Sequence, residues 1–318
     1  MRAYQVSQTG APAGMADIPV PDPGQGQVRL DIRACGLNFA DLLIQKGTYQ
    51  DIPPFPATLG MEVSGVINAL GESVTGFAIG DRVAVFGGHG GLADQGVFDV
   101  ARVIHLPDGM SFTQGAAFQI AYGTAHMALD FCARLRPGET LLVTGAAGGT
   151  GLAAVEIGKL MGARVIAQAR GADKLAVAGA AGADHLIDDS DDLRSRLLDL
   201  GGADVVYDTV GGDVFRAAFR ATNPGGRLLP IGFASGDVPQ IPANHLLVKN
   251  LTVIGFYIGG YMKFNPQPIA NSLETLIDWH LSGRLHPHIG HTLPLERVGE
   301  GMELLRSRKS TGKVVITL

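Results

Sequence analysis

The residues with the clearest chemical potential form a glycine-rich segment, Val143-Thr144-Gly145-Ala146-Ala147-Gly148-Gly149-Thr150-Gly151. The segment follows an apolar run that predicts a buried parallel strand, and it precedes a helix predicted over 149–161. Aligned with G-x-G-x-x-G, it reads Ala146-x-Gly148-x-x-Gly151, with alanine in the first glycine position. The middle glycine lets the backbone approach a pyrophosphate, the last lets helix and strand pack closely, and the helix N-terminus attracts the anion. The segment therefore predicts a dinucleotide-binding turn rather than a purely structural one, with cofactor contacts from Ala147, Gly148, Gly149, Thr150 and Gly151.

The charges that follow the next predicted strand bear on the choice of cofactor. A site for NAD places an acidic residue about 20 positions after the turn, where it binds the ribose 2′-hydroxyl. Here that zone carries Arg170 and Lys174, with Asp173 as the only acid nearby. Two cations suit a 2′-phosphate, so we predict NADPH. The alternative is that these are solvated charges at the end of a strand.

The order of predicted elements indicates the fold class. From about residue 116, strands and helices alternate, which favours an α/β fold with a doubly wound parallel sheet. Before that point the chain is β-rich, with period-two alternation over 28–34 and a short helix over 38–46 that ends at Gly47. The other predicted strands are 140–144, 164–167, 184–187, 203–207, 226–231, 251–257 and 312–318, and the other helices are 173–181, 191–200, 214–222, 270–281 and 298–307.

Composition narrows the classes of function. The 318 residues suggest two domains, and 46% hydrophobic against 17% charged residues excludes a disordered chain. The net charge of −5 does not favour a nucleic-acid partner. No signal segment is evident and the longest uncharged apolar stretch, 250–262, falls short of the ~20 residues of a membrane span, so we expect a cytoplasmic protein without membrane contact. The two cysteines form neither a disulfide framework nor a zinc knuckle.

Several further motifs, taken together, resemble the medium-chain dehydrogenase/reductase superfamily, specifically its zinc-independent NADPH:quinone oxidoreductase branch, the zeta-crystallin-like proteins. Besides the glycine-rich turn, the motifs are Ala34-Cys35-Gly36-Leu37-Asn38-Phe39-Ala40-Asp41, Pro56-Ala57-Thr58-Leu59-Gly60-Met61-Glu62-Val63-Ser64-Gly65, Gly80-Asp81-Arg82-Val83, Gly182-Ala183-Asp184 and Gly312-Lys313-Val314-Val315. The resemblance implies a β-rich, chaperonin-10-like substrate domain over 1–122 and 263–318, with a Rossmann domain inserted over 123–262. It also implies a homodimer joined through the last Rossmann strand, near 251–258.

The residues at the zinc-ligand positions of the superfamily indicate its zinc-independent branch. Zinc-dependent relatives carry cysteine and histidine where this chain has Asn38 and Met61. An amide and a thioether do not make a catalytic zinc site, so we expect no metal. Without a Lewis acid, hydride transfer suits a conjugated acceptor, and reduction of a quinone is the leading prediction. Reduction of an enal, enone or enoyl thioester is the alternative, and a non-enzymatic NADPH-binding protein is a more distant one.

The resemblance also suggests roles for individual side chains. It places Asn38 and Asp41 beside the nicotinamide and substrate, and Tyr49 where it can stack on a flat ring or donate to the developing oxyanion. Other interpretations are that Asn38 merely caps a helix, and that Tyr49 and Tyr257 are ordinary boundary aromatics. By the same resemblance the nicotinamide is contacted by Thr124, Gly232, Phe233, Phe256 and Tyr257, and the 2′-phosphate lies near Lys313.

One departure from the family pattern weakens the NADPH prediction. The family often has a tyrosine after the third Rossmann strand that touches the adenosine phosphate, whereas this chain has Asp188 and Asp189.

Overall fold

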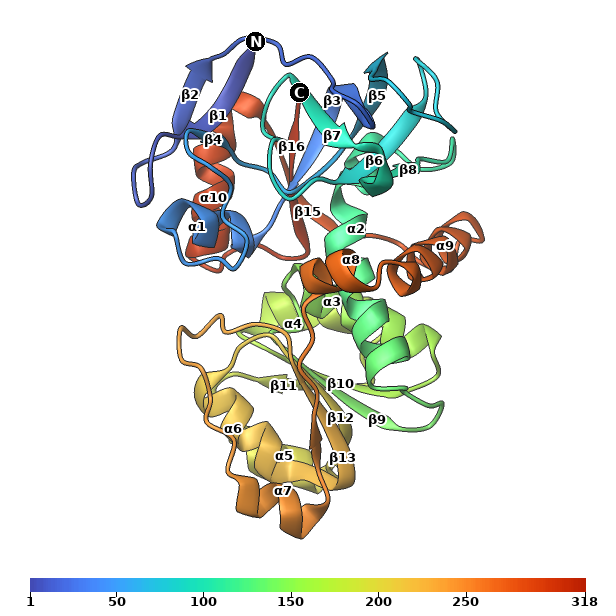
Figure 1. The fold of residues 1–318 in the computed structure, drawn as a ribbon. Coiled ribbons are helices and arrows are strands. Elements are labelled where there is room, and N and C mark those ends of the chain that lie inside the picture. Colours follow the sequence, from blue (N-terminus) through green and yellow to red (C-terminus); the bar gives the residue numbers. More distant parts are fainter. The chain divides into compact units, whose positions relative to one another are not determined.

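The computed structural model describes residues 1–318 as two compact units (Figure 1). The first unit comprises Met1–Ile120 and Pro287–Leu318, and the second comprises Ala121–His286. Sequence analysis placed 263–286 with the substrate domain, whereas the structure places this segment in the second unit. The reason is helix α9 (Gln267–Leu281), which packs against the π-helix Met127–Cys132. In addition, Nδ1 of His126, the residue before the π-helix, lies 2.8 Å from Ser272 Oγ in α9.

The second unit is built on a parallel sheet of six strands, in the order β11-β10-β9-β12-β13-β14. This is the doubly wound order of a Rossmann fold, and it confirms the predicted fold class. The order reverses between β9 and β12, the position at which such sheets bind ligands at the carboxyl ends of their strands. The strands are β9 (Thr140–Thr144), β10 (Arg164–Ala169), β11 (His185–Asp188), β12 (Ala203–Asp208), β13 (Thr222–Pro230) and β14 (Thr252–Val253).

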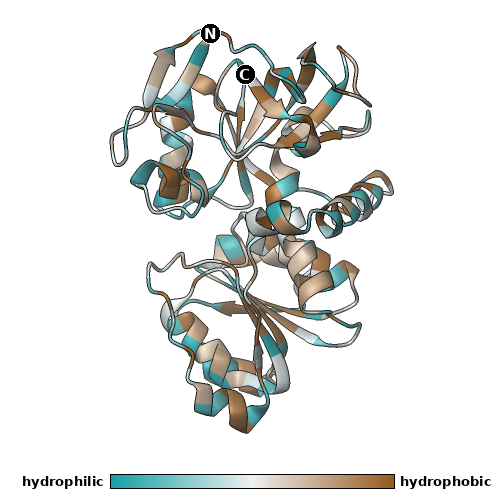
Figure 2. Cartoon of the chain, viewed as in Figure 1, coloured by the Kyte–Doolittle hydropathy of each residue, from teal (hydrophilic) through white to brown (hydrophobic).

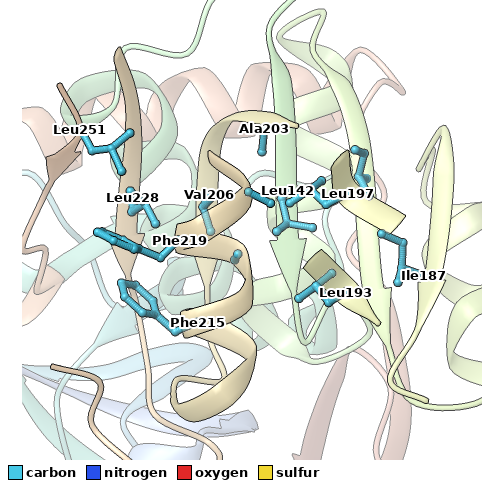
Figure 3. Close-up of a cluster of buried hydrophobic side chains, with 13 residues drawn as sticks. Leu142, Ile187, Leu193, Leu197, Ala203, Val206, Phe215, Phe219, Leu228 and Leu251 are labelled. Carbon is cyan, nitrogen blue, oxygen red and sulfur yellow. The ribbon is translucent and has the colours of Figure 1, made fainter. Parts of the chain in front are cut away.

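Helices cover this sheet through apolar faces. In α6 (Gly212–Ala221), Phe215, Ala218 and Phe219 are buried while Arg216 and Arg220 are exposed, the pattern of an amphipathic helix (Figure 2). Its aromatic side chains pack against apolar residues of the strands in one core cluster (Figure 3). The other helices here are α3 (Gly149–Leu160), α4 (Ala172–Ala180), α5 (Leu193–Asp199), α7 (Ala243–Lys249) and α8 (Ile258–Phe264), and α2 (Phe112–His126) starts in the first unit.

The first unit contains a seven-stranded sheet, in the order β15-β16-β3-β5-β6-β8 with β7 also paired to β3, and a three-stranded sheet, β2-β1-β4. The C-terminal strand β16 pairs antiparallel with β3, which aligns Val314 with Leu37. This pairing brings the start of β16 beside the start of α1 (Phe39–Lys46). The strands are β1 (Arg2–Val6), β2 (Gly14–Asp17), β3 (Gln27–Leu37), β4 (Ala57–Thr58), β5 (Glu62–Leu70), β6 (Arg82–Phe86), β7 (Gln95–Asp99), β8 (Val103–His105), β15 (Ile289–Pro294) and β16 (Lys313–Thr317), and the last helix is α10 (Val298–Arg306).

Some elements differ from the sequence prediction. Helix α2 was missed because residues 115–126 are buried on every side, so its sequence lacks the apolar stripe of a surface helix. The strand predicted over 251–257 is wrong in length, since β14 pairs only through Thr252 and Val253 with β13, and Tyr257 already caps α8. No helix is both long and apolar enough to cross a bilayer.

Candidate active site

The predicted dinucleotide turn lies between β9 and α3, at the carboxyl edge of the parallel sheet. Gly148 is the N-cap of α3, and Gly145 has a φ of 61°, a left-handed conformation that favours glycine. The tight-turn function therefore falls to Gly145, whereas the sequence alignment had put alanine, at 146, in the first glycine position. A Cβ on Gly151 would meet Gly145 O at 2.3 Å, so this position requires glycine for helix and strand to pack. A Cβ on Gly148 would meet only Gly145 O, at 3.4 Å, which leaves open space for a ligand to approach.

The first backbone N–H groups of α3 are free to bind an anion. Leu152 N donates to Gly148 O, so helical bonding starts there and the preceding amides of Gly149, Thr150 and Gly151 have no partner earlier in the helix. Together with the helix dipole, they provide the donors for a pyrophosphate.

Buried polar side chains beneath the turn hold it in place. Thr144 Oγ1 donates to Asp208 Oδ1, joining the ends of β9 and β12 where the strand order reverses. Asp208 also accepts from Gly211 N at 2.8 Å, while burial raises the pKa of its carboxyl group. On the other side, Gln168 Oε1 accepts from Gly145 N at 3.2 Å. The turn is therefore fixed before any ligand arrives.

Arg170 and Lys174 lie at the end of β10 and in α4, on the same edge of the sheet as the turn. Arg170 is exposed, and its Nε lies 3.1 Å from Asp189 Oδ2, which leaves its two Nη amines for other acceptors. Asp188 accepts hydrogen bonds from the hydroxyl and backbone N–H of Ser190 and from Gly171 N at 2.7 Å, and these bonds hold the pKa of its carboxyl group below the usual range. Asp188 therefore shapes the β10–α4 turn, while Asp189 orients Arg170.

In the first unit, Asn38 and Asp41 mark the start of α1. Asn38 is the N-cap, and Asn38 N donates to Asp41 Oδ2 at 2.9 Å. Asp41 Oδ1 accepts from Gly60 N at 3.0 Å, and the residue has no exposed surface. Burial raises the pKa of Asp41 to about 6. In this conformation Asp41 cannot touch a substrate, so its position corrects the predicted substrate contact: Asp41 fixes the helix and the loop at Gly60.

Lys313 lies beside this pair. Its Nζ is 2.7 Å from Asn38 Oδ1, 2.8 Å from Leu37 O and 2.6 Å from Glu62 Oε1. The Lys313 and Glu62 side chains are 4% and 0% exposed, so the ion pair is buried. The expected place of Lys313 near a 2′-phosphate is therefore wrong in this conformation, because an ammonium has three N–H donors and all three are taken.

The remaining predicted residues fall on separate segments. Tyr49, in the first unit, follows the αL cap Gly47 and is half-buried. In the second unit, Thr124 is buried in α2 and Gly232 N donates to Asp208 O at 3.2 Å. Phe256 packs against Tyr261, with ring centroids 5.6 Å apart. Phe233 is exposed, and Tyr257 is the N-cap of α8.

Sequence analysis did not identify three residues that position these sites: Gln168 and Asp208, which fix the glycine turn, and Glu62, which pairs with Lys313. All three are buried polar side chains, and such groups require partners. A polar residue directly after a predicted buried strand was the available signal for Gln168 and Asp208.

Known proteins share this architecture. Residues 24–108 match the alcohol dehydrogenase GroES-like domain family, and residues 149–278 match the zinc-binding dehydrogenase family. A quinone oxidoreductase-like protein 2 homolog of Nematostella vectensis is 40% identical over 323 residues, covering 99% of this chain and 88% of that protein. The quinone oxidoreductase of Thermus thermophilus, solved also with NADPH, has a TM-score of 0.88 at 33% identity, and each chain is covered fully. The Escherichia coli quinone oxidoreductase complexed with NADPH has a TM-score of 0.92 at 26% identity, again with full coverage of both chains.

A GroES-like unit combined with a Rossmann unit and its glycine turn defines a nucleotide-dependent dehydrogenase or reductase. The chain belongs to the medium-chain dehydrogenase/reductase superfamily, with quinone oxidoreductase-like proteins among its relatives.

The zinc implied by one matching family does not fit the residues present. The two positions that supply thiolate and imidazole in zinc enzymes hold Asn38 and Met61, and Asn38 Oδ1 accepts from the Lys313 ammonium. Neither an amide nor a thioether replaces those ligands, and a neighbouring ammonium disfavours a second cation. The donor set therefore does not suit catalytic zinc.

Proposed function

We propose that this protein is an NADPH-dependent reductase that transfers hydride to quinones without a metal. The proposal is carried by one combination: a preformed dinucleotide turn in a chain whose zinc-ligand positions are occupied by Asn38 and Met61, with the Lys313 ammonium alongside. NADPH supplies the hydride, and a quinone accepts it on its conjugated system and takes a proton to give the hydroquinone. Such acceptors are reduced without the Lewis acid on which alcohol oxidation depends.

The residues of the chain bind and orient the reactants. The backbone amides of Gly149, Thr150 and Gly151 bind the pyrophosphate, next to Ala147 and Gly148. Arg170 and Lys174 bind the 2′-phosphate, with Arg170 held by Asp189. Nicotinamide contacts come from Thr124, Gly232, Phe233, Phe256 and Tyr257, and a substrate contact from Tyr49.

Electron acceptors separate this proposal from its alternatives. NADPH oxidation is followed with 1,2-naphthoquinone, trans-2-hexenal and crotonyl-CoA, and each assay is repeated with NADH. We expect the quinone to give the highest kcat/KM of the three acceptors. We also expect a higher kcat/KM with NADPH than with NADH. A higher kcat/KM for the enal or the thioester would identify an enone or enoyl-thioester reductase. Turnover with none of them, despite NADPH binding, would favour a non-enzymatic role.

Zinc independence has its own test. Purified active protein is analysed for metal by mass spectrometry and assayed after treatment with a chelator. We expect substoichiometric zinc and unchanged turnover. Stoichiometric zinc together with loss of activity on chelation would refute metal-independent catalysis.

We also propose a homodimer joined through the last Rossmann strand. Strand β14 ends the six-stranded order, and Leu247 and Val248, on the preceding α7, are 78% and 75% exposed. A free strand edge beside exposed apolar side chains is suited to pairing with a second copy. Light scattering after size exclusion should give twice the chain mass of 33.2 kDa for the wild type, and the chain mass itself for a L247E/V248E variant.

A further inference from the structure

The lysine at the start of β16 is saturated by oxygen acceptors of the first unit. Lys313 Nζ donates to Leu37 O, Asn38 Oδ1 and Glu62 Oε1, at 2.8, 2.7 and 2.6 Å. The second carboxylate oxygen, Glu62 Oε2, accepts from Ile120 N at 2.9 Å. The ion pair thus joins β16, the β3–α1 junction, β5 and α2, all within this unit.

The Lys313 ammonium determines which end of the Asn38 amide faces it. An ammonium only donates hydrogen bonds, so the Asn38 atom that faces Lys313 must be the oxygen. The amide nitrogen then faces Glu62 Oε1 at 3.0 Å and Gly36 O at 3.2 Å, both acceptors. The backbone N–H of Asp41 donates to the backbone oxygen of Asn38 at 3.0 Å and not to its side chain. The two N–H donors and one Oδ1 lone pair of the amide are therefore engaged, and the second Oδ1 lone pair remains.

We propose that Lys313 and Glu62 are positioning residues, and that through them Asn38 is presented to the bound ligands as a hydrogen-bond acceptor. The inference rests on the proposed function, because it assigns Asn38 a partner in the reductase. That partner must carry an N–H or O–H group, such as the nicotinamide carboxamide, a ribose hydroxyl or the hydroquinone product. A quinone oxygen is itself an acceptor, so Asn38 does not stabilise charge on it.

The charges around Asp41 give the cluster a second effect. Asp41 is faced by Lys313, which lowers its pKa, and by Glu62, which raises it, while Cys35 lies close by and backbone amides come from Asn38 and Gly60. Removal of the ammonium therefore raises the pKa of Asp41 further. If α1 holds Asn38 in place only while Asp41 is ionised, a variant at Lys313 should shift the acid limb of the pH–rate profile to higher pH.

Variants of the ion pair test the proposal. K313M is compared with K309M, a lysine-to-methionine control on an exposed residue, at a temperature at which circular dichroism shows both to be folded. We expect K313M to lose about tenfold to hundredfold in kcat, by the same factor with NADPH and NADH, as misplacement of a positioned group does. K309M should stay within about twofold, as expected for an exposed site far from such features.

Two results would overturn the inference. A loss confined to NADPH would mean that Lys313 binds the 2′-phosphate after all, and an unchanged kcat together with an unshifted pH profile would mean a purely structural role. If K313M does not fold because Glu62 is left unpaired, the double variant E62Q/K313M removes both charges. It should show the same loss of kcat.

A structure of the wild-type protein with NADPH gives a test that is independent of turnover. We expect Asn38 Oδ1 to lie about 3 Å from an N–H or O–H group, with the Lys313 contact kept. The amide and hydroxyl sources are distinguished by which ligand atom is found there. Nδ2 turned toward a ligand oxygen, or no ligand atom within hydrogen-bond distance of Asn38, would overturn the inference. A wild type that binds NADPH but reduces no acceptor would defeat the proposed function instead.

Discussion

The burial of Asp41 predicts how the free energy of unfolding depends on pH, and by how much. Its carboxyl group is buried without exposed surface, and burial raises its pKa to about 6, against about 3.9 for an ordinary aspartate. The folded state therefore holds a proton on Asp41 over a pH range in which the unfolded chain has released it. The contribution of Asp41 to the free energy of unfolding is therefore fully present below about pH 4 and is lost as pH rises through about 6.

The size of the effect comes from the shift itself. Two pKa units correspond to about 3 kcal/mol of unfolding free energy. Asp41→Asn removes the titration and places an amide N–H against one of the two backbone donors, at a pH-independent cost of about 1–3 kcal/mol. The free energy of unfolding of the wild type minus that of D41N should thus fall by about 2 kcal/mol between pH 4 and pH 7, because the unfolded chain is already about half ionised at this position at pH 4.

Urea unfolding at a series of pH values measures this difference, with circular dichroism as the signal. Taking the difference between the two proteins cancels every group that titrates identically in both. Asp173→Asn, which makes the same change at an exposed carboxyl group in α4, is the matched control. A D41N difference that is constant within about 0.5 kcal/mol, or that rises with pH, would show that the reasoning about burial is wrong.

Three further predictions concern the two sites. Gly151→Ala should raise the Kd for NADPH at least about tenfold by isothermal titration, because the new Cβ would meet Gly145 O at 2.3 Å and displace α3; unchanged affinity would contradict the packing argument. Arg170→Leu should lower the NADPH-to-NADH ratio of kcat/KM about tenfold, through loss of the 2′-phosphate contact, and an equal loss with both cofactors would argue against that contact. Glu62→Ala should reduce the free energy of unfolding by about 3–5 kcal/mol, since it leaves the Lys313 ammonium buried and unpaired, and a loss below about 1 kcal/mol would contradict the buried ion pair.

The acids after the third Rossmann strand show how tertiary contacts change the meaning of a sequence. In sequence, Asp188 and Asp189 count against a cofactor with an extra phosphate. In the structure, Asp188 bonds to the backbone at Gly171, and Asp189 contacts Gln168 and Arg170. Both carboxylates therefore bond to protein groups around Arg170, the predicted partner of the 2′-phosphate.

What the sequence alone determined is the local pattern. The alternation of buried strands and helices from β9 to α6, and the glycine turn that begins α3, depend on neighbours a few residues apart, and both lie where they were expected. Short-range periodicity and backbone conformation fix such features, so they can be predicted before the fold is known.

Only the tertiary structure decided the surroundings of Asn38. Lys313 lies 275 residues from Asn38 along the chain and reaches it because β16 pairs with β3. No local spacing encodes that pairing, since it is stabilised by contacts that exist only once the sheet has formed. The same contacts bury Asp41 and Glu62, and so set which side chains remain able to meet a ligand.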